Sequence, residues 1–172
     1  LRALLNDVNT YPLERENSRL WREYYRARIL HIEGKIESAY QLYSKLLATS
    51  PTDPKLSAYI MADYGETLRQ LKKHEEAIPY LEKAVSTIPI DTKLAWTFHQ
   101  LSGAYQRLNR RADAWAIAER LRDYCAKNGD QYGLLLALDR LRVLYNNQGN
   151  FHEADKIRQQ MREILALMPF SI

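Results

Sequence analysis

A repeated pattern of prolines and alanines constrains the fold of this chain more than any other feature. Proline stands at positions 12, 51 and 89, each time after a segment with helical spacing of apolar residues. Because proline cannot continue a helix, each one is predicted to follow a helix end. Alanine recurs in step at positions 39, 77, 114 and 154. We therefore expect several copies of one supersecondary motif.

Each period is predicted to contain a helix, a tight turn and a second helix. A short turn precedes every one of the four alanines, and a small side chain at that point lets the second helix approach the first closely. Upstream of the turns, apolar residues recur at helical intervals, as in the segment 59–71. Only 6 Gly and 6 Pro occur among 172 residues, which favours helices over hairpins. The expected fold class is all-α.

The pattern also sets the expected boundaries. We predict one domain over 1–172, built from helix pairs at 18–51, 56–89, 92–128 and 132–168. The third pair ends in Asn128-Gly129 rather than proline, and this dipeptide is itself a helix stop. Residues 1–12 read as the closing helix of a preceding pair, and the chain begins with Leu1. We therefore expect it to be a fragment of a larger protein.

The segment 58–89 resembles a tetratricopeptide repeat. It carries the family's small residues and apolar positions at Gly65, Leu68, Leu71, Ala77, Leu81 and Ala84, and the terminating Pro89. Less complete matches extend the resemblance over 18–168. The alanines are 38, 37 and 40 residues apart, whereas the family repeats about every 34 residues. The resemblance therefore points to a longer-period variant and implies a right-handed α-solenoid.

In this family the first helix of each pair lines a concave face that commonly receives a peptide. The resemblance thus implies a binding face that is aromatic and basic, and side chains of this kind dominate interaction hot spots. Alternatively, its aromatic residues pack between neighbouring helices. The implied face residues are Trp21, Tyr24, Tyr25, Arg28, Tyr59, Glu66, Arg69, Gln70, Trp96, His99, Gln100, Arg107, Arg140, Asn146 and Asn147.

Some members of the family grip a chaperone's terminal carboxylate with Lys, Asn and Arg side chains from three successive repeats. The chain does not supply this set in either possible alignment. Starting from the first helix pair, the positions hold Tyr24, Arg28, Asp63, Trp96 and Gln100; starting from the second, they hold Ala62, Glu66, Gln100, Leu136 and Arg140. The expected partner is therefore an acidic or amphipathic protein segment rather than a chaperone tail.

The sequence gives no sign of catalytic chemistry. The histidines, His31, His74, His99 and His152, fall one to each helix pair, and none belongs to a His-Glu-x-x-His motif. The single cysteine, Cys125, reads as a buried small apolar residue. A glycine-rich phosphate loop, a nucleophile elbow and zinc-ligand spacing are all missing from the sequence. We predict no enzyme activity, no catalytic residue, no metal and no cofactor.

Charge and hydropathy narrow the class of partner. The net charge is +4, and the nearest approach to a basic patch is a group of arginines at 107, 110, 111, 120 and 122, which reads as a solvated surface. Nucleic-acid binding is therefore not expected. No apolar stretch approaches the roughly 18 residues of a membrane span. With one cysteine a reducing compartment is permitted, and we predict a cytoplasmic location.

The last segment of the chain is unusually apolar for the end of a solenoid, whose outer face is normally polar. We predict that it docks on another part of a larger protein or forms a homodimer, through Ile164, Leu165, Leu167, Met168 and Phe170. Two functions remain open from the sequence. The first is a scaffold that binds a protein or peptide, and the alternative is a sensor or oligomerisation domain of a bacterial signalling or transcription regulator.

Overall fold

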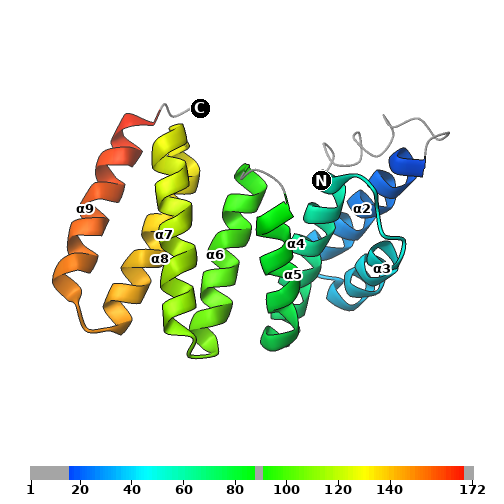
Figure 1. Cartoon of the computed structure of the whole chain (residues 1–172), viewed down its shortest axis with the longest axis horizontal. Coiled ribbons are helices and arrows are strands. Elements are labelled where there is room, and N and C mark those ends of the chain that lie inside the picture. The colour runs from blue at the N-terminus through cyan, green and yellow to red at the C-terminus, as the bar shows by residue number, and fades with distance from the viewer. Residues whose placement is uncertain (1–15, 88–90, 169–172) are drawn as a thin grey trace. The chain divides into compact units, whose positions relative to one another are not determined.

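The computed structural model describes residues 16–87 and 91–168 (Figure 1). Within these ranges the secondary structure is entirely helical, as predicted from the composition. The helices are α2 (Glu16–Ile32), α3 (Ile36–Ala48), α4 (Pro54–Gln70), α5 (His74–Thr87), α6 (Thr92–Arg107), α7 (Arg111–Asn128), α8 (Gln131–Asn147) and α9 (Phe151–Leu167). The closing helix expected at 1–12, and Phe170 of the expected docking surface, lie outside the described residues.

The helices pack pairwise as helix–turn–helix repeats: α2 with α3, α4 with α5, α6 with α7 and α8 with α9. The chain divides into two compact units, unit 1 (Leu1–Pro89) and unit 2 (Ile90–Ile172). In unit 1, α2 also packs against α4, and in unit 2, α6 packs against α8. Neighbouring first helices therefore lie side by side within each unit. The expectation of one domain over the whole chain stays a prediction.

Aspartate caps fix where three of the first helices begin. The Asp53 carboxylate accepts hydrogen bonds from two backbone N–H groups at the start of α4, at 2.9 and 3.2 Å. Asp91 accepts one from α6 and Asp130 one from α8, both at 2.9 Å. A side-chain acceptor at this position satisfies a backbone donor that has no partner inside the helix. These caps set the register of α4, α6 and α8.

The tight turn inside each pair depends on one residue in the left-handed region. Gly34 and Gly149 adopt φ values of 76° and 77°, while Lys72 and Asn109 adopt 63° and 59°. Residues other than glycine adopt this backbone conformation at a cost of roughly 1 kcal/mol. At Lys72 and Asn109 the packing of the two helices must offset this cost. Gly129 has φ 69° at the end of α7, which confirms the predicted helix stop.

Small residues let the paired helices touch, as the repeat pattern predicts. All four periodic alanines, Ala39, Ala77, Ala114 and Ala154, have an exposed fraction of 0%. Gly65 of α4 has the same role from the other side, because a Cβ atom built on it would lie 2.7 Å from Cγ of Leu81 in α5. No methyl group fits there unless Leu81 moves. The close helix contact thus requires glycine at this position.

Large side chains fill the core between the helices of each unit. Tyr24, Tyr43 and Leu81 are fully buried in unit 1, and Phe98 and Leu121 in unit 2. Cys125 is also fully buried, as expected from its apolar position. In the parts of the chain that the structure describes, no helix is long and apolar enough to cross a membrane.

Candidate binding faces

An aromatic cluster covers the α2–α4 side of unit 1. The ring of Trp21 lies 5.9 Å from that of Tyr25 and 6.0 Å from that of Tyr59, which it meets edge to face. All three side chains are partly exposed. The indole Nε1–H of Trp21 donates a hydrogen bond of 3.0 Å to Asp53, so the residue that caps α4 also orients this ring. The cluster is a rigid apolar surface with polar edges.

A carboxylate sits at the centre of the same side of unit 1. One oxygen of Asp63 accepts a 2.8 Å hydrogen bond from the hydroxyl of Tyr24 and a 3.5 Å bond from that of Tyr43. The guanidinium of Arg28 lies 3.6 Å from it. Burial, with the Asp63 charge nearby, raises the pKa of both tyrosines, so they remain protonated donors. They hold Asp63 in place from beneath the surface.

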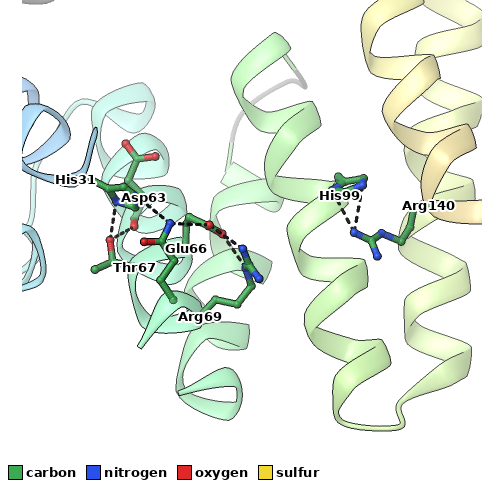
Figure 2. A network of polar contacts seen from close by, with 8 residues as sticks. His31, Asp63, Glu66, Thr67, Arg69, His99 and Arg140 are labelled. Atoms are coloured by element: carbon green, nitrogen blue, oxygen red, sulfur yellow. Dashed lines mark hydrogen bonds and ion pairs between the residues drawn. The ribbon is translucent and has the colours of Figure 1, made fainter. Parts of the chain in front are cut away.

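A chain of hydrogen bonds links the end of α2 to the end of α4 (Figure 2). The amide nitrogen of Gln70 lies 2.9 Å from Nε2 of His31, and since an amide nitrogen only donates, Nε2 must accept. Nδ1 of His31 therefore carries the proton and donates to the hydroxyl of Thr67 at 3.1 Å. That hydroxyl in turn donates to the backbone carbonyl of Asp63 at 2.7 Å. The network fixes one tautomer of His31.

Glu66 and Arg69 form a bidentate pair on the α4 surface, with both N···O distances 2.8 Å (Figure 2). The amide of Gln70 also donates to Glu66 at 3.2 Å. Two parallel hydrogen bonds to one carboxylate are stronger and more directional than a single one. The guanidinium of Arg69 is consequently held flat along its own helix rather than extended into solvent.

A second polar and aromatic group lies on the α6–α8 side of unit 2. Trp96, whose exposed fraction is 44%, stacks on His99 with a centroid distance of 5.1 Å. Nε2 of His99 lies 3.4 Å from Asp139, and a guanidinium nitrogen of Arg140 lies 3.2 Å from Nδ1. Since a carboxylate only accepts, Nε2 carries a proton and donates to Asp139. The same Arg140 nitrogen also lies 3.1 Å from Nε2, so the guanidinium covers the ring rather than bonding to one nitrogen. Figure 2 shows Arg140 directed at the His99 ring.

Asp139 is the most strongly perturbed carboxylate on this side of unit 2. The hydrogen bond from His99 and a 2.6 Å hydrogen bond from Arg142 hold the pKa of Asp139 well below its usual range. The carboxylate therefore stays ionised even in moderate acid. It anchors the His99 ring on which Trp96 lies.

The structure distributes the predicted face residues unevenly. It brings Trp21, Tyr25 and Tyr59 together in unit 1, and Trp96, His99 and Arg140 in unit 2. Tyr24 has an exposed fraction of 0% and Gln100 of 7%, so neither side chain presents a contact surface to a partner. Arg107 and Asn147 are exposed at the ends of α6 and α8 and Asn146 is partly exposed, whereas Trp96 lies near the start of α6.

Sequence reasoning missed three of the residues that hold these faces in place: Asp53, Asp63 and Thr67. One signal could have found Asp63, though not Asp53 or Thr67, which lie 32 and 36 positions from Trp21 and His31. Tyr24 and Asp63 are 39 positions apart, His31 and Gln70 are also 39 apart, and His99 and Asp139 are 40 apart. These separations equal about one period of the repeat, so polar residues one period apart on first helices are candidates for direct contact.

The last helix carries the other predicted surface. In α9 only Ala154 is buried. Leu165 and Leu167 have exposed fractions of 43% and 76%, and Ile164 and Met168 are partly exposed. Within the described residues no group of three or more His, Cys, Asp or Glu side chains could hold a metal ion.

Residues 58–91 match the tetratricopeptide repeat family model. They include α5 and all of α4 after its first four residues, the pair with the fullest set of repeat residues. No curated protein matches the chain significantly. Solved structures match far more of it. BtubC from P. vanneervenii is 18% identical with a TM-score of 0.75, covering 96% of this chain and 70% of its own.

Two further structures give the same result. A kinesin light chain candidate with nearly identical TPR-like repeats, from Podosopora anserina, is 20% identical with a TM-score of 0.71 and covers 99% of this chain and 85% of its own. The MamA RS-1 double mutant is 17% identical with a TM-score of 0.69, over 96% and 84%. At these identities the likeness shows the fold: all-α, with helices packed as TPR-like repeats. Such repeats are typically protein-interaction scaffolds and usually have no catalytic role.

Proposed function

We propose that this chain binds a protein or peptide segment on the first-helix faces of its repeats, and that it catalyses no reaction. The observation that carries the proposal is the partly exposed cluster of Trp21, Tyr25 and Tyr59, whose rings are fixed by mutual contacts and by Asp53. Tyr and Trp supply large contact area with few rotatable bonds, so a preordered cluster loses little entropy on binding.

In unit 2, Trp96 extends the proposal to a second face. Its ring is substantially exposed, while His99, Asp139 and Arg140 hold it from one side. An exposed Trp that a hydrogen-bonded network holds in place is suited to contact a partner and contributes little to the core. The proposed contact residues are Trp21, Tyr25, Arg28, Tyr59, Glu66, Arg69, Gln70, Trp96, His99, Arg107, Arg140, Asn146 and Asn147.

The pairing of the arginines favours an amphipathic partner over a purely acidic one. Arg28 lies beside Asp63, and Arg69 is bound by Glu66. A partner carboxylate would have to compete with these internal acids, whereas an apolar side chain can pack on the aromatic rings without displacing anything. Acidic residues of the partner would then lie at the edges of the contact.

A peptide selection followed by titration tests the proposal. Peptides chosen from a random display library on the full chain would be labelled, and their dissociation constants measured by fluorescence anisotropy. The double variant Tyr25→Ser/Tyr59→Ser should weaken binding by at least about tenfold, because hot-spot aromatics each contribute about 2 kcal/mol or more. The triple variant Arg28→Ala/Arg69→Ala/Arg107→Ala should weaken it less.

The matched control is Glu82→Ser/Lys83→Ser, which changes two exposed positions on the second helix α5. It should leave the dissociation constant within about twofold. Circular dichroism would verify equal helicity in all variants. If the tyrosine variant and the control bind alike, the first-helix face is not the binding surface.

A second candidate is a sensor or oligomerisation domain of a larger bacterial regulator, acting through a homodimer. The exposed Leu165 and Leu167 of α9 favour it, since apolar side chains on an outer helix are suited to an interface. Sedimentation velocity tests it: the chain should show a dimer that Leu165→Glu/Leu167→Glu converts to monomer. A concentration-independent monomer would rule it out. Two further proposals hold for both candidate functions. The repeats of this chain are a longer-period variant of the tetratricopeptide repeat, and the protein is located in the cytoplasm.

A further inference from the structure

A cavity of about 220 Å³ opens in unit 2 where the turn between α6 and α7 meets the end of α8. Its apolar lining comes from Trp115 and Leu144. Leu144 is buried, and the Trp115 ring meets Tyr145 edge to face at a centroid distance of 4.6 Å. Both apolar groups are therefore held in place by packing.

The polar lining consists of one guanidinium and four amides. Arg111 opens α7, and its Nε–H donates to the Asn109 amide oxygen at 3.2 Å. Gln106, Asn147 and Gln148 supply the remaining amides. None of the seven lining residues is acidic. The cavity therefore presents one positive charge and many hydrogen-bonding groups.

Arg111 differs from the arginines at 28, 69 and 110, each of which lies beside an internal acid. Arg28 lies beside Asp63, Arg69 is paired with Glu66, and the neighbouring Arg110 pairs with Asp113 at 2.7 Å. Across residues 16–87 and 91–168, no carboxylate forms an ion pair with Arg111, whose only side-chain hydrogen bond is to Asn109. Its two terminal nitrogens retain the fork geometry that binds a carboxylate through two parallel hydrogen bonds. An external acid would meet no internal competitor here.

The volume limits what can enter. Pockets for small molecules and cofactors measure about 300–1,000 Å³, so a cavity of about 220 Å³ is too small for a nucleotide. It suits one or two amino-acid side chains. The amides can satisfy the backbone of an extended peptide, because each offers both a donor and an acceptor.

We propose that this cavity binds a short peptide in which a carboxylate stands beside a bulky aliphatic side chain. The aliphatic group packs on Trp115 and Leu144, while Arg111 takes the carboxylate. This inference rests on the proposed peptide-binding function and adds a site at the turn ends of α6 and α8, remote from the aromatic group around Trp96. Because Asn147 lines the cavity, one predicted face residue belongs to this site.

Nuclear magnetic resonance of the full chain tests the proposal with defined probes. The probe peptide is acetyl-Gly-Leu-Asp-Leu-Gly-amide, and the control peptide carries Asn in place of Asp. The first should shift the indole resonance of Trp115 and the side-chain amides of Asn147 and Gln148. The control peptide should bind about tenfold more weakly, because it loses the charge-assisted bonds to the guanidinium.

Two variants complete the test. Arg111→Gln should lower the affinity for the Asp peptide about tenfold, and the matched Arg122→Gln, on the same helix but paired with Asp123, should change it less than about twofold. Arg111 is exposed, so its replacement leaves the fold intact, and the spectra report this directly.

Three results would overturn the inference. One is an equal affinity for the Asp and Asn peptides, and another is the absence of Trp115 shifts at millimolar peptide. The third is a uridine decamer that shifts the same resonances more strongly and loses its effect as salt is raised, which would assign the cavity to RNA. If, in the second case, the peptide shifts only the Trp96 and His99 resonances, it does not bind at this cavity, but the proposed binding by the first-helix face is supported.

Discussion

At the scale of single residues, small side chains decide whether the helix pairs form. The four periodic alanines are fully buried and Gly65 leaves no room for a methyl group, so each repeat depends on one close contact between its two helices. These residues could be predicted from the sequence, because the requirement recurs in every period. The contact at Gly65 gives a direct test.

Gly65→Ala should destabilise the chain by about 1–3 kcal/mol, because the new Cβ overlaps the buried Leu81 and overpacking costs more than helix propensity returns. Urea unfolding measures the change. The matched control is Gly103→Ala in α6, where the nearest group is the terminal guanidinium of Arg140, at 3.2 Å. It needs to move by only a few tenths of an ångström, so the effect should stay within about 1 kcal/mol of zero. Equal destabilisation by the two changes would contradict the packing described here.

Asp139 should make the stability of the chain depend on acid pH. Its pKa is lowered in the folded state by His99 and Arg142, so its contribution is complete above the unfolded value of about 4 and is lost as the pH falls below it. The side chain is 36% exposed, so the contribution should be below about 1 kcal/mol. Urea unfolding of Asp139→Asn and the unaltered chain should converge between about pH 5 and pH 2. A constant difference would contradict this role.

At the scale of the helices, the sequence predicts the number and pairing of the described helices well. It predicts less well which side chains of each helix are buried and which are exposed. Proline, glycine and alanine mark helix ends and contacts, and these marks are local. Tyr24 and Tyr25 show what is not local: both are aromatic residues on one turn of α2, yet only Tyr24 is fully buried. Helical spacing cannot say which of two adjacent tyrosines faces the core. The decision comes from Asp63, one period away, which binds the Tyr24 hydroxyl.

The start of α4 links helix formation to the aromatic cluster. Asp53→Ala should cost about 1–2 kcal/mol, because it removes the cap of α4 and leaves the Trp21 indole without its acceptor. The adjacent Thr52→Ala, at an exposed position, should stay within about 0.5 kcal/mol. Both values come from urea unfolding, and tryptophan emission should shift only in Asp53→Ala. An unchanged stability would show that the cap is not needed.

At the scale of the whole molecule, function depends on the face that each unit presents rather than on one reactive group. Each unit places an aromatic anchor on its first helices and supports it with hydrogen-bonded polar residues. This arrangement suits the binding of an extended segment, in which many modest contacts add up. The second helices carry the buried alanines and the structural contacts, and they should be largely insensitive to a partner that binds the first helices.

Hydrogen exchange read by mass spectrometry tests this division most directly. A selected peptide at saturating concentration should slow backbone exchange in α2 and α4, and in α6 and α8, by about tenfold or more, since bound segments open less often. Exchange in α3, α5 and α7 should change much less. We expect protection to alternate along the chain, with slower exchange in the first helix of each pair than in the second. Protection confined to the second helices, or to α9 alone, would contradict it.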